Sequence, residues 1–347
     1  MSHADERFSL VTDWVTRELR LKPRLIEPAS SDASFRRYFR VFHEGGTHIV
    51  MDAPPGREDV RPYLNITVML ETAGVHVPRV YEWDVERGLL LLEDLGTRPY
   101  LPALQAADDA DMLYRDALQA LADIQVRGQE SAFQLPAYDR AALVREMALM
   151  PEWFCARHLQ LDLTRGQGEM LAGAFEFLVE EALAQPQVFV HRDYHSRNLM
   201  ITRERNPGII DFQDAVRGPV GYDLVSLLKD CYISWPRPRV AGWVREYRLM
   251  MHKQASHSAG INDAQMLHWI DVIGIQRHLK VLGIFARLWY RDGKSGYLKD
   301  LPLTLRYVVD ACARFPQLQA LRDYLQHFVV PALPLANARE VPQVVSA

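Results

Sequence analysis

Long apolar runs, paired cysteines and an excess of one charge are all missing from this sequence. Its apolar stretches, such as Leu89–Leu92, have the length of a strand and fall far short of the roughly 20 residues that cross a bilayer. The N-terminus is polar and acidic, which is not the pattern of a secretory signal. The formal net charge of −4 favours neither nucleic acid nor an anionic membrane as a partner. We therefore expect a cytoplasmic protein that binds no nucleic acid and no membrane.

Cysteine and lysine are both scarce. Cys155, Cys231 and Cys312 are odd in number and lack the spacing of metal ligands, which predicts buried free thiols in a reducing compartment. The only lysine before Lys229 is Lys22. The segment from Lys229 to Asp300, in contrast, holds twelve Lys or Arg and six Asp or Glu. Such a basic segment is either a solvated surface or part of a site for neutral or acidic ligands.

The 347 residues suffice for two lobes of unequal size. The first part is rich in strand-forming residues, and Gly45-Gly46 supplies a hairpin turn. It predicts a first helix over Phe8–Leu21, a second over Val60–Thr72, and strands over Arg24–Pro28, Arg36–Phe42, Thr47–Ala53, Val80–Asp84 and Gly88–Glu93. We expect this lobe to span residues 1–95 and to bind the adenine and phosphates of a nucleotide.

After Gly96 the apolar spacing becomes helical. Helices are predicted over Ala107–Arg127, Arg140–Leu149, Gly166–Ala184, Tyr222–Asp230, Arg239–Ser256, Asp263–Tyr290, Leu303–Arg314 and Gln317–Val330. They would form a larger lobe over residues 96–330, followed by a loosely held, proline-containing tail over residues 331–347. The expected fold class is α+β: a small β-rich lobe with one helix packed on it, a larger α-helical lobe, and an ATP cleft between them.

One segment, His191–Asn198, has the pattern H-x-D-x-x-x-x-N, and Asp211 follows an apolar pair thirteen residues after Asn198. Phosphoryl transfer requires a carboxylate that orients and deprotonates the attacking hydroxyl, and oxygen ligands for Mg²⁺. Asp193 is the candidate base, and Asn198 and Asp211 are the candidate metal ligands. Either aspartate alone fits a turn or a strand-end ion pair equally well. Both motifs in this order, each beside a strand-like run, favour a kinase site.

Short strands flank these motifs, with Val188–Val190 expected to pair with Leu199–Ile201. A buried strand ending at Glu93 leaves one predicted lobe for the other, and an adenine ring could pair with backbone groups near Glu93 and Leu95. A plain core strand followed by a turn is the alternative.

The polar stretch Ser30–Tyr38 lies between two predicted strands. Its backbone N–H groups and hydroxyls, including those of Ser31 and Ser34, are candidate donors to phosphates. It contains no glycine, so an ordinary polar hairpin is the alternative.

With these residues the chain resembles the aminoglycoside phosphotransferase/choline kinase family, which has the protein-kinase-like fold. The resemblance runs from about Ser30 to Tyr307. It is most specific over three segments, His191–Asn198, Ile210–Asp214 and Gly221–Leu224.

The family resemblance implies that ATP and Mg²⁺ are used. It also implies that Asp193 is the base, that Asn198 and Asp211 hold the metal, and that Asp223 is a buried carboxylate bracing the catalytic loop. We expect His191 to support the same loop and not to take part in the chemistry.

Within this family, several segments resemble the bacterial anomeric kinases of N-acetylmuramate and N-acetylglucosamine, which serve peptidoglycan recycling. They are Ser31–Arg40, Val50–Pro55, Gln276–Lys280 and Arg291–Lys294. The resemblance implies ATP-dependent phosphorylation of the anomeric hydroxyl of an amino sugar, giving a sugar 1-phosphate.

One position departs from the family. Met51 stands where kinases of this fold usually place a lysine that holds the phosphates. Arg37 or Arg40, on the neighbouring predicted strand, could supply that charge, with the forked geometry of a guanidinium.

Candidate acceptor contacts lie in the basic segment. Arg277 and Lys280 share one face of a predicted helix by their spacing and would pair with the lactyl carboxylate of N-acetylmuramate. A solvated helix edge is the alternative. Asp230 and Tyr232 are candidate sugar contacts, since a carboxylate accepts hydrogen bonds from hydroxyls and a ring stacks on a pyranose. Helix-end packing is the alternative for both.

Three functions stay open at this point: an anomeric kinase of amino sugars, a kinase of homoserine, choline or an aminoglycoside, and a nucleotide-binding pseudokinase. The basic segment disfavours cationic acceptors. The missing lysine fits a pseudokinase, whereas Asp193, Asn198 and Asp211 together favour an enzyme. The sequence leaves the oligomeric state open.

Overall fold

The computed structural model of the chain describes residues 3–31, 35–106, 109–254 and 260–339. It divides into two compact units. Unit 1 comprises Met1–Ala103 and Arg197–Asp214, and unit 2 comprises Leu104–Ser196 and Ala215–Ala347. The first crossing lies between Ala103 and Leu104, whereas the sequence-based boundary was placed after Leu95. The return of Arg197–Asp214 to unit 1 was not predicted, and it assigns Asn198 and Asp211 to unit 1 and Asp193 to unit 2.

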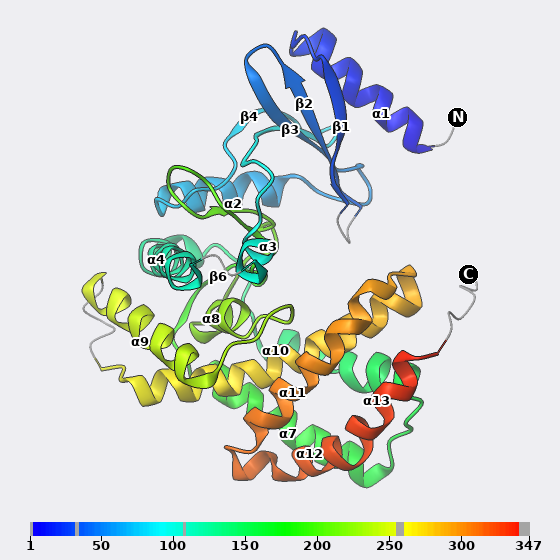
Figure 1. Ribbon diagram of the computed structural model, residues 1–347, viewed down its shortest axis with the longest axis vertical. Coiled ribbons are helices and arrows are strands. Elements are labelled where there is room, and N and C mark those ends of the chain that lie inside the picture. Colours follow the sequence, from blue (N-terminus) through cyan, green and yellow to red (C-terminus); the bar gives the residue numbers. More distant parts are fainter. Residues whose placement is uncertain (1–2, 32–34, 107–108, 255–259, 340–347) are drawn as a thin grey trace. The chain divides into compact units, whose positions relative to one another are not determined.

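Unit 1 is built on a five-stranded antiparallel sheet in the order β1-β2-β3-β5-β4 (Figure 1). The strands lie close to the predicted ranges: β1 (Leu25–Ser31), β2 (Arg37–His43), β3 (Gly46–Asp52), β4 (Val80–Asp84) and β5 (Leu89–Glu93). Helix α1 (His3–Asp13) and the π-helical turn after it (Trp14–Glu18) pack on one face of the sheet. Phe39 and Val41 of β2 face this helix, in a core with Val11, Trp14 and Val15. Helix α2 (Arg61–Thr72) connects β3 to β4.

The segment that returns to unit 1 carries two short strands. Strand β7 (Leu199–Met200) pairs with β8 (Gly208–Ile209), and β6 (Gln187–Val190) pairs with β9 (Val216–Pro219) within unit 2. The predicted pairing of Val188–Val190 with Leu199–Ile201 was therefore wrong. Strand β9 was missed because its four residues include a glycine and a proline, which weaken a strand signal.

Unit 2 is helical, and most of its helices were predicted within three residues at each end. They are α4 (Ala110–Arg127), α5 (Gln129–Ala132), α6 (Arg140–Met147), a π-helix (Met150–Leu159), α7 (Arg165–Leu183), α8 (Gly221–Leu228), α9 (Arg237–Gln254), α10 (Asp263–Asp292), α11 (Leu301–Cys312), α12 (Gln319–Tyr324), a π-helical turn (Leu325–Val329) and α13 (Val330–Asn337). Helix α3 (Tyr100–Gln105) contains the crossing from unit 1, and 3₁₀ turns lie at Ser295–Asp300 and Pro316–Leu318.

Helix α10 is the centre of unit 2. Its middle, from Ile270 to Gly283, is buried on all sides, because α6 to α9, α11 and the π-helix Met150–Leu159 all contact it. At Gly283 an added Cβ would lie 2.3 Å from the Leu149 carbonyl carbon, so only glycine allows this approach. Basic residues in this stretch are therefore inside the unit and not on a solvated edge.

The predicted loose tail needs a correction. Pro331–Asn337 belongs to helix α13, where Leu333 and Ala336 are buried, and residues 340–347 lie outside the described residues. Pro331 lies in the first turn of α13, where its missing N–H would have no partner, whereas Pro334 lies inside the helix. The three cysteines are free and buried, as predicted.

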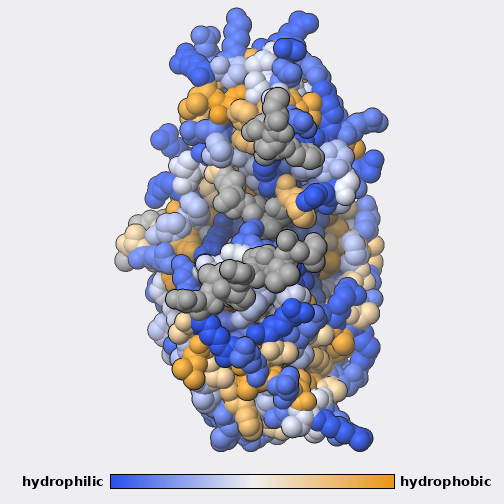
Figure 2. All heavy atoms as spheres, turned by 90° about the vertical axis from the view of Figure 1, so that its right-hand side faces the viewer, coloured by the Kyte–Doolittle hydropathy of each residue, from blue (hydrophilic) through white to orange (hydrophobic). Residues whose placement is uncertain are grey.

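Among the described residues, no helix is both long and apolar enough to cross a bilayer. On the face drawn in Figure 2, hydrophilic and hydrophobic residues are interspersed.

Candidate active site

The segment that carries Asp193 is held at its start by a buried carboxylate. The backbone N–H groups of His191 and Arg192 donate to Asp223 of α8, at 2.7 and 2.9 Å. Arg192 has a φ of +78°, a conformation that a non-glycine residue adopts only where its surroundings impose it. Burial raises the pKa of the Asp223 carboxyl to about 7, although both N–H groups favour its ionised form.

A second buried carboxylate holds the other end of this segment. Asp230 accepts hydrogen bonds from the Ser196 backbone N–H at 3.1 Å and from the Ser196 hydroxyl, and its second oxygen accepts from the Tyr232 N–H at 3.1 Å. Asp223 lies in α8, and Asp230 follows the end of that helix by two residues. Residues 191–196 are thus fastened at one end to α8 and at the other end to the turn directly after it.

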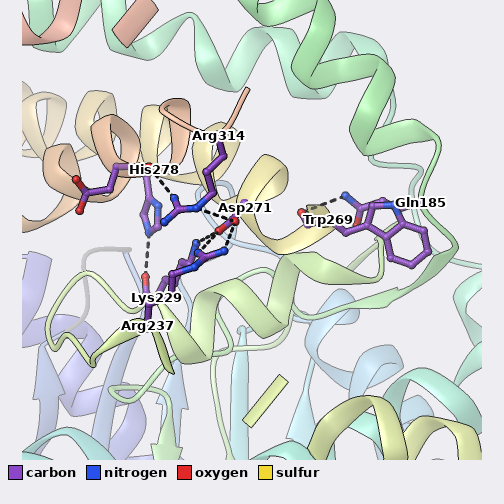
Figure 3. A network of polar contacts seen from close by, with 8 residues as sticks. Gln185, Lys229, Arg237, Trp269, Asp271, His278 and Arg314 are labelled. Atoms are coloured by element: carbon purple, nitrogen blue, oxygen red, sulfur yellow. Dashed lines mark hydrogen bonds and ion pairs between the residues drawn. The ribbon is translucent and has the colours of Figure 1, made fainter. Parts of the chain in front are cut away.

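Lys229, the residue before Asp230, is held by a network of ion pairs around Asp271 of α10. Figure 3 shows Lys229, Arg237 and Arg314 converging on Asp271, with Nζ or guanidinium nitrogens 2.7 to 3.5 Å from its oxygens. His278 donates from Nε2 to the Lys229 carbonyl at 2.9 Å. Burial lowers the pKa of His278 to about 3, so its ring is neutral and serves as a fixed donor.

Asp193 is partly buried and lies among cations. Burial alone would raise the pKa of its carboxyl, but Lys280, His195, Arg277 and Arg192 hold that pKa below its usual value. The carboxylate is therefore ionised at neutral pH, as a proton acceptor must be.

Lys280 is part of a buried pair. Its Nζ lies 3.0 Å from Glu146 of α6 and donates to the Tyr222 hydroxyl at 3.1 Å. Arg192 and the Tyr138 hydroxyl also contact Glu146. Burial favours the neutral amine, yet Tyr222 and Glu146 keep the pKa of Lys280 above its ordinary value.

Arg277 differs from Lys280. The residue is 3% exposed, its Nε has no hydrogen-bond partner among the described residues, and its one hydrogen bond goes to Cys231 Sγ at 3.7 Å. In the described part of the chain it makes no ion pair with a carboxylate. Tyr232 lies in the same unit, with its ring 5.5 Å from that of His195, in an edge-on contact.

The pairing of β7 with β8 brings the two candidate metal ligands together. Asn198 directly precedes β7, Asp211 follows β8 by two residues, and the Asn198 amide lies 3.3 Å from Asp211 Oδ2. Asp211 has a φ of +64°, a left-handed backbone conformation that is uncommon for a residue other than glycine. Gln213 Nε2 donates to the other Asp211 oxygen at 2.8 Å.

The chemistry of this group fits Mg²⁺. A carboxylate and amide oxygens are the hard ligands that this ion prefers. Gln213 is 9% exposed, and its Oε1 is buried without a hydrogen-bond partner in the described residues, so a further oxygen is available beside Asp211. Arg36 lies here as well, with a guanidinium nitrogen 3.5 Å from Asp211 Oδ1.

The two arginines expected to bind phosphate are held in ion pairs. Arg37 and Arg7 both contact the fully buried Asp52, and Arg37 Nε donates to it at 3.0 Å. Arg40 makes a forked contact with Asp94, at 2.7 and 3.0 Å, and donates to the Gly96 carbonyl at 3.0 Å.

The other nucleotide-binding predictions fall on β1, β5 and the turn after β5. The Glu93 N–H already donates to the Arg79 carbonyl at 2.8 Å, so it is not available to an adenine ring. Leu95 is partly buried and packs on Gly208, where an added Cβ would come within 2.7 Å of Leu95 Cδ1. Ser31 ends β1, but its side chain, like all of Ser34, lies outside the described residues.

Comparison with known proteins decides the family. The sequence profile of the phosphotransferase enzyme family matches residues 25–255. The chain belongs to this family. Among family members, the N-acetylmuramate/N-acetylglucosamine kinase of Pseudomonas aeruginosa is 49% identical over 310 residues, covering 87% of this chain and 88% of that protein. Proteins of the same name from Pseudomonas putida and Neisseria meningitidis are 43% and 40% identical, over 94% and 87% of this chain and 97% and 90% of theirs.

Solved structures of other kinases share the fold. Choline kinase LicA from Streptococcus pneumoniae matches with a TM-score of 0.60 at 11% identity, covering 89% of this chain and all of LicA. The ADP-bound aminoglycoside phosphotransferase APH(2'')-Ib matches with a TM-score of 0.58 at 16% identity, over 87% of this chain and 98% of its own. The predicted protein-kinase-like fold is confirmed.

Three neighbours of the candidate site residues were missed from the sequence. Arg36 and Gln213 contact Asp211 in unit 1, and Glu146 pairs with Lys280 in unit 2. A signal existed for Arg36, since apolar Phe39 and Val41 mark the core face of their strand and place Arg36 on the opposite face. None existed for Glu146, whose partners Arg192 and Lys280 lie far away in the sequence.

Proposed function

We propose that this protein transfers the γ-phosphoryl group of ATP to the anomeric hydroxyl of N-acetylmuramate and N-acetylglucosamine, giving the sugar 1-phosphate in peptidoglycan recycling. The observation that carries the proposal is the 49% identity, over most of both chains, to a kinase named for these two sugars. The reaction would take place in the cytoplasm with small molecules as the only required partners.

In the proposed reaction the anomeric oxygen attacks the γ-phosphorus, the bond to the β–γ bridging oxygen breaks, and ADP leaves. The hydroxyl proton passes to the Asp193 carboxylate, late in a loose transition state. The lowered pKa of Asp193 keeps this carboxylate ionised before the reaction. Asn198 and Asp211 would hold Mg²⁺, which offsets negative charge on phosphate oxygens when it is bound.

Arg277 supports an acidic acceptor. In the described part of the chain no carboxylate contacts the buried Arg277 directly, although the charges of Asp193 and Asp230 favour its guanidinium. The lactyl carboxylate of N-acetylmuramate would supply a direct partner. Lys280 is less suited to this role because it is already paired with Glu146. We assign Tyr232 to packing against the sugar, and Asp230 to holding Ser196 instead of a sugar hydroxyl. The adenine is assigned to backbone groups near Leu95.

The experiment that tests the function is ADP release from ATP and Mg²⁺ with a panel of acceptors. The panel contains N-acetylmuramate, N-acetylglucosamine, its 1-O-methyl glycoside, homoserine, choline and kanamycin. We expect turnover with the two free amino sugars only, and loss of turnover in Asp193→Asn but not in Asp162→Asn, which changes an exposed aspartate. Turnover with another acceptor alone would sink the substrate assignment. No turnover with any acceptor would favour a pseudokinase.

The metal assignment has its own test. Asp211→Asn should weaken Mn²⁺ binding, followed by electron paramagnetic resonance in the presence of ADP, and should reduce turnover. Unchanged Mn²⁺ binding would contradict the assignment.

A further inference from the structure

The sheet of unit 1 has a methionine where a phosphate-binding lysine is expected. Met51 of β3 is 1% exposed and lies opposite Tyr38 of β2 and Leu90 of β5. Lys22 is the only lysine in unit 1, whose segments are Met1–Ala103 and Arg197–Asp214. A side chain of this unit that binds phosphate with a permanent positive charge must therefore be an arginine or Lys22.

The alternation of side chains along β2 sorts its arginines by face. Phe39 and Val41 face α1, and Arg37 lies on that side too, where it shares Asp52 with Arg7 of α1. The residue before the strand, Arg36, falls on the opposite face, together with Tyr38. Tyr38 and Met51 are directly opposite each other in register, so Arg36 lies on the face that Met51 occupies.

Arg36 also lies beside the candidate metal ligand. Its side chain is 11% exposed, and its guanidinium is 3.5 Å from Asp211 Oδ1, whereas Gln213 lies at 2.8 Å from the same oxygen. Charge-assisted hydrogen bonds are usually about 2.7–2.9 Å long, so the Arg36 contact with Asp211 is an ion pair without a tight hydrogen bond. If Asp211 holds Mg²⁺, the phosphates that the ion neutralises would bind on the same side as this guanidinium, which contacts the same carboxylate.

We propose that Arg36 binds the phosphates of ATP in the place of a lysine at position 51. The inference rests on the proposed use of ATP. A guanidinium binds two phosphate oxygens at once through its planar fork, which a lysine cannot do. Arg37 and Arg40 then have a different task, since Asp52 and Asp94 hold them within the sheet and its last turn.

The test compares Arg36→Met with Arg36→Lys and, as a matched control, Arg61→Met, which removes an exposed arginine from α2. Dissociation constants for ATP, ADP and adenosine are measured by calorimetry without acceptor, together with the melting temperature and the KM for ATP and sugar. We expect Arg36→Met to weaken ATP and ADP binding by about 10- to 100-fold, the range for hydrogen bonds to charged groups. Adenosine binding, the sugar KM and the melting temperature should not change. Arg36→Lys should recover part of the loss.

Equal ATP binding by wild type and Arg36→Met would overturn the proposal, and so would an equal loss for adenosine, which has no phosphate. Wild-type protein that binds ATP but transfers nothing to either sugar would overturn the substrate assignment alone. Wild-type protein that binds no ATP would overturn both.

Discussion

The substitution Asp230→Asn tests whether Asp230 holds the segment that carries Asp193 or binds the sugar. It is 1% exposed and accepts three hydrogen bonds, two from Ser196 and one from Tyr232. In Asp230→Asn the amide has the same shape, but one oxygen becomes an NH₂ group that faces an N–H donor. The two other hydrogen bonds then go to a neutral amide oxygen instead of a charged carboxylate oxygen.

The cost follows from these contacts. Each bond that loses its charge costs about 1 kcal/mol, and a buried N–H without an acceptor costs roughly 1–3 kcal/mol. The sum of about 3–5 kcal/mol corresponds to a melting temperature lower by roughly 6–20 °C for a unit of this size. Because the segment that carries Asp193 loosens, kcat should fall by at least about tenfold, with the KM for sugar changing less than about threefold.

The assay combines scanning calorimetry with steady-state kinetics on Asp230→Asn, Ser196→Ala and the double variant. A double-mutant cycle should give a coupling energy of about 1.5–3 kcal/mol between the two residues. Asp162→Asn controls for an aspartate change at an exposed position. A variant at position 230 with the wild-type melting temperature and kcat but a raised KM for sugar would refute the reasoning and make Asp230 a sugar ligand.

Three further predictions concern the buried charges of unit 2. Arg277→Met should lower kcat/KM for N-acetylmuramate by roughly 10- to 100-fold and change that for N-acetylglucosamine little, since only the first sugar has a carboxylate; equal losses would contradict it. The same variant should move the acid limb of the kcat/KM profile to higher pH, because one cation that lowers the pKa of Asp193 is gone; an unmoved limb would count against Asp193 as base. Glu146→Gln leaves Lys280 buried without its partner and should cost about 3–5 kcal/mol at neutral pH. Since the pKa of Glu146 is lowered, its contribution is complete above the ordinary glutamate value of 4.5 and is lost as the pH falls through the lower folded value. The stability difference, measured by urea unfolding, should therefore shrink in acid, and a constant difference would speak against the ion pair.

Features that depend on residues close together in the sequence, such as the strands and helices, were predicted well. Alternating Phe, Tyr, Ile and Val residues mark the strands of unit 1. Asp193, Asn198 and Asp211 could be recognised because all three lie within 19 residues of the sequence. Their chemical type and spacing carried the kinase hypothesis before any tertiary contact was known.

Contacts between distant residues could not be predicted in this way. Arg37 and Arg40 looked available for phosphate, but Asp52 and Asp94 hold them, 15 and 54 residues away in the sequence. Asp230 looked like a sugar contact because its partner Ser196 is 34 residues upstream. Spacing on a helix put Arg277 and Lys280 on one face, yet only packing against α6 shows that one is paired with Glu146 and the other is not.

The central claim is that phosphate is added to the anomeric oxygen, and the most direct measurement is proton-coupled ³¹P NMR of the product made from ATP and N-acetylglucosamine. We predict a phosphorus signal coupled to the anomeric proton, and no product from the 1-O-methyl glycoside. Coupling to the C6 protons, or a product from the blocked sugar, would contradict the account.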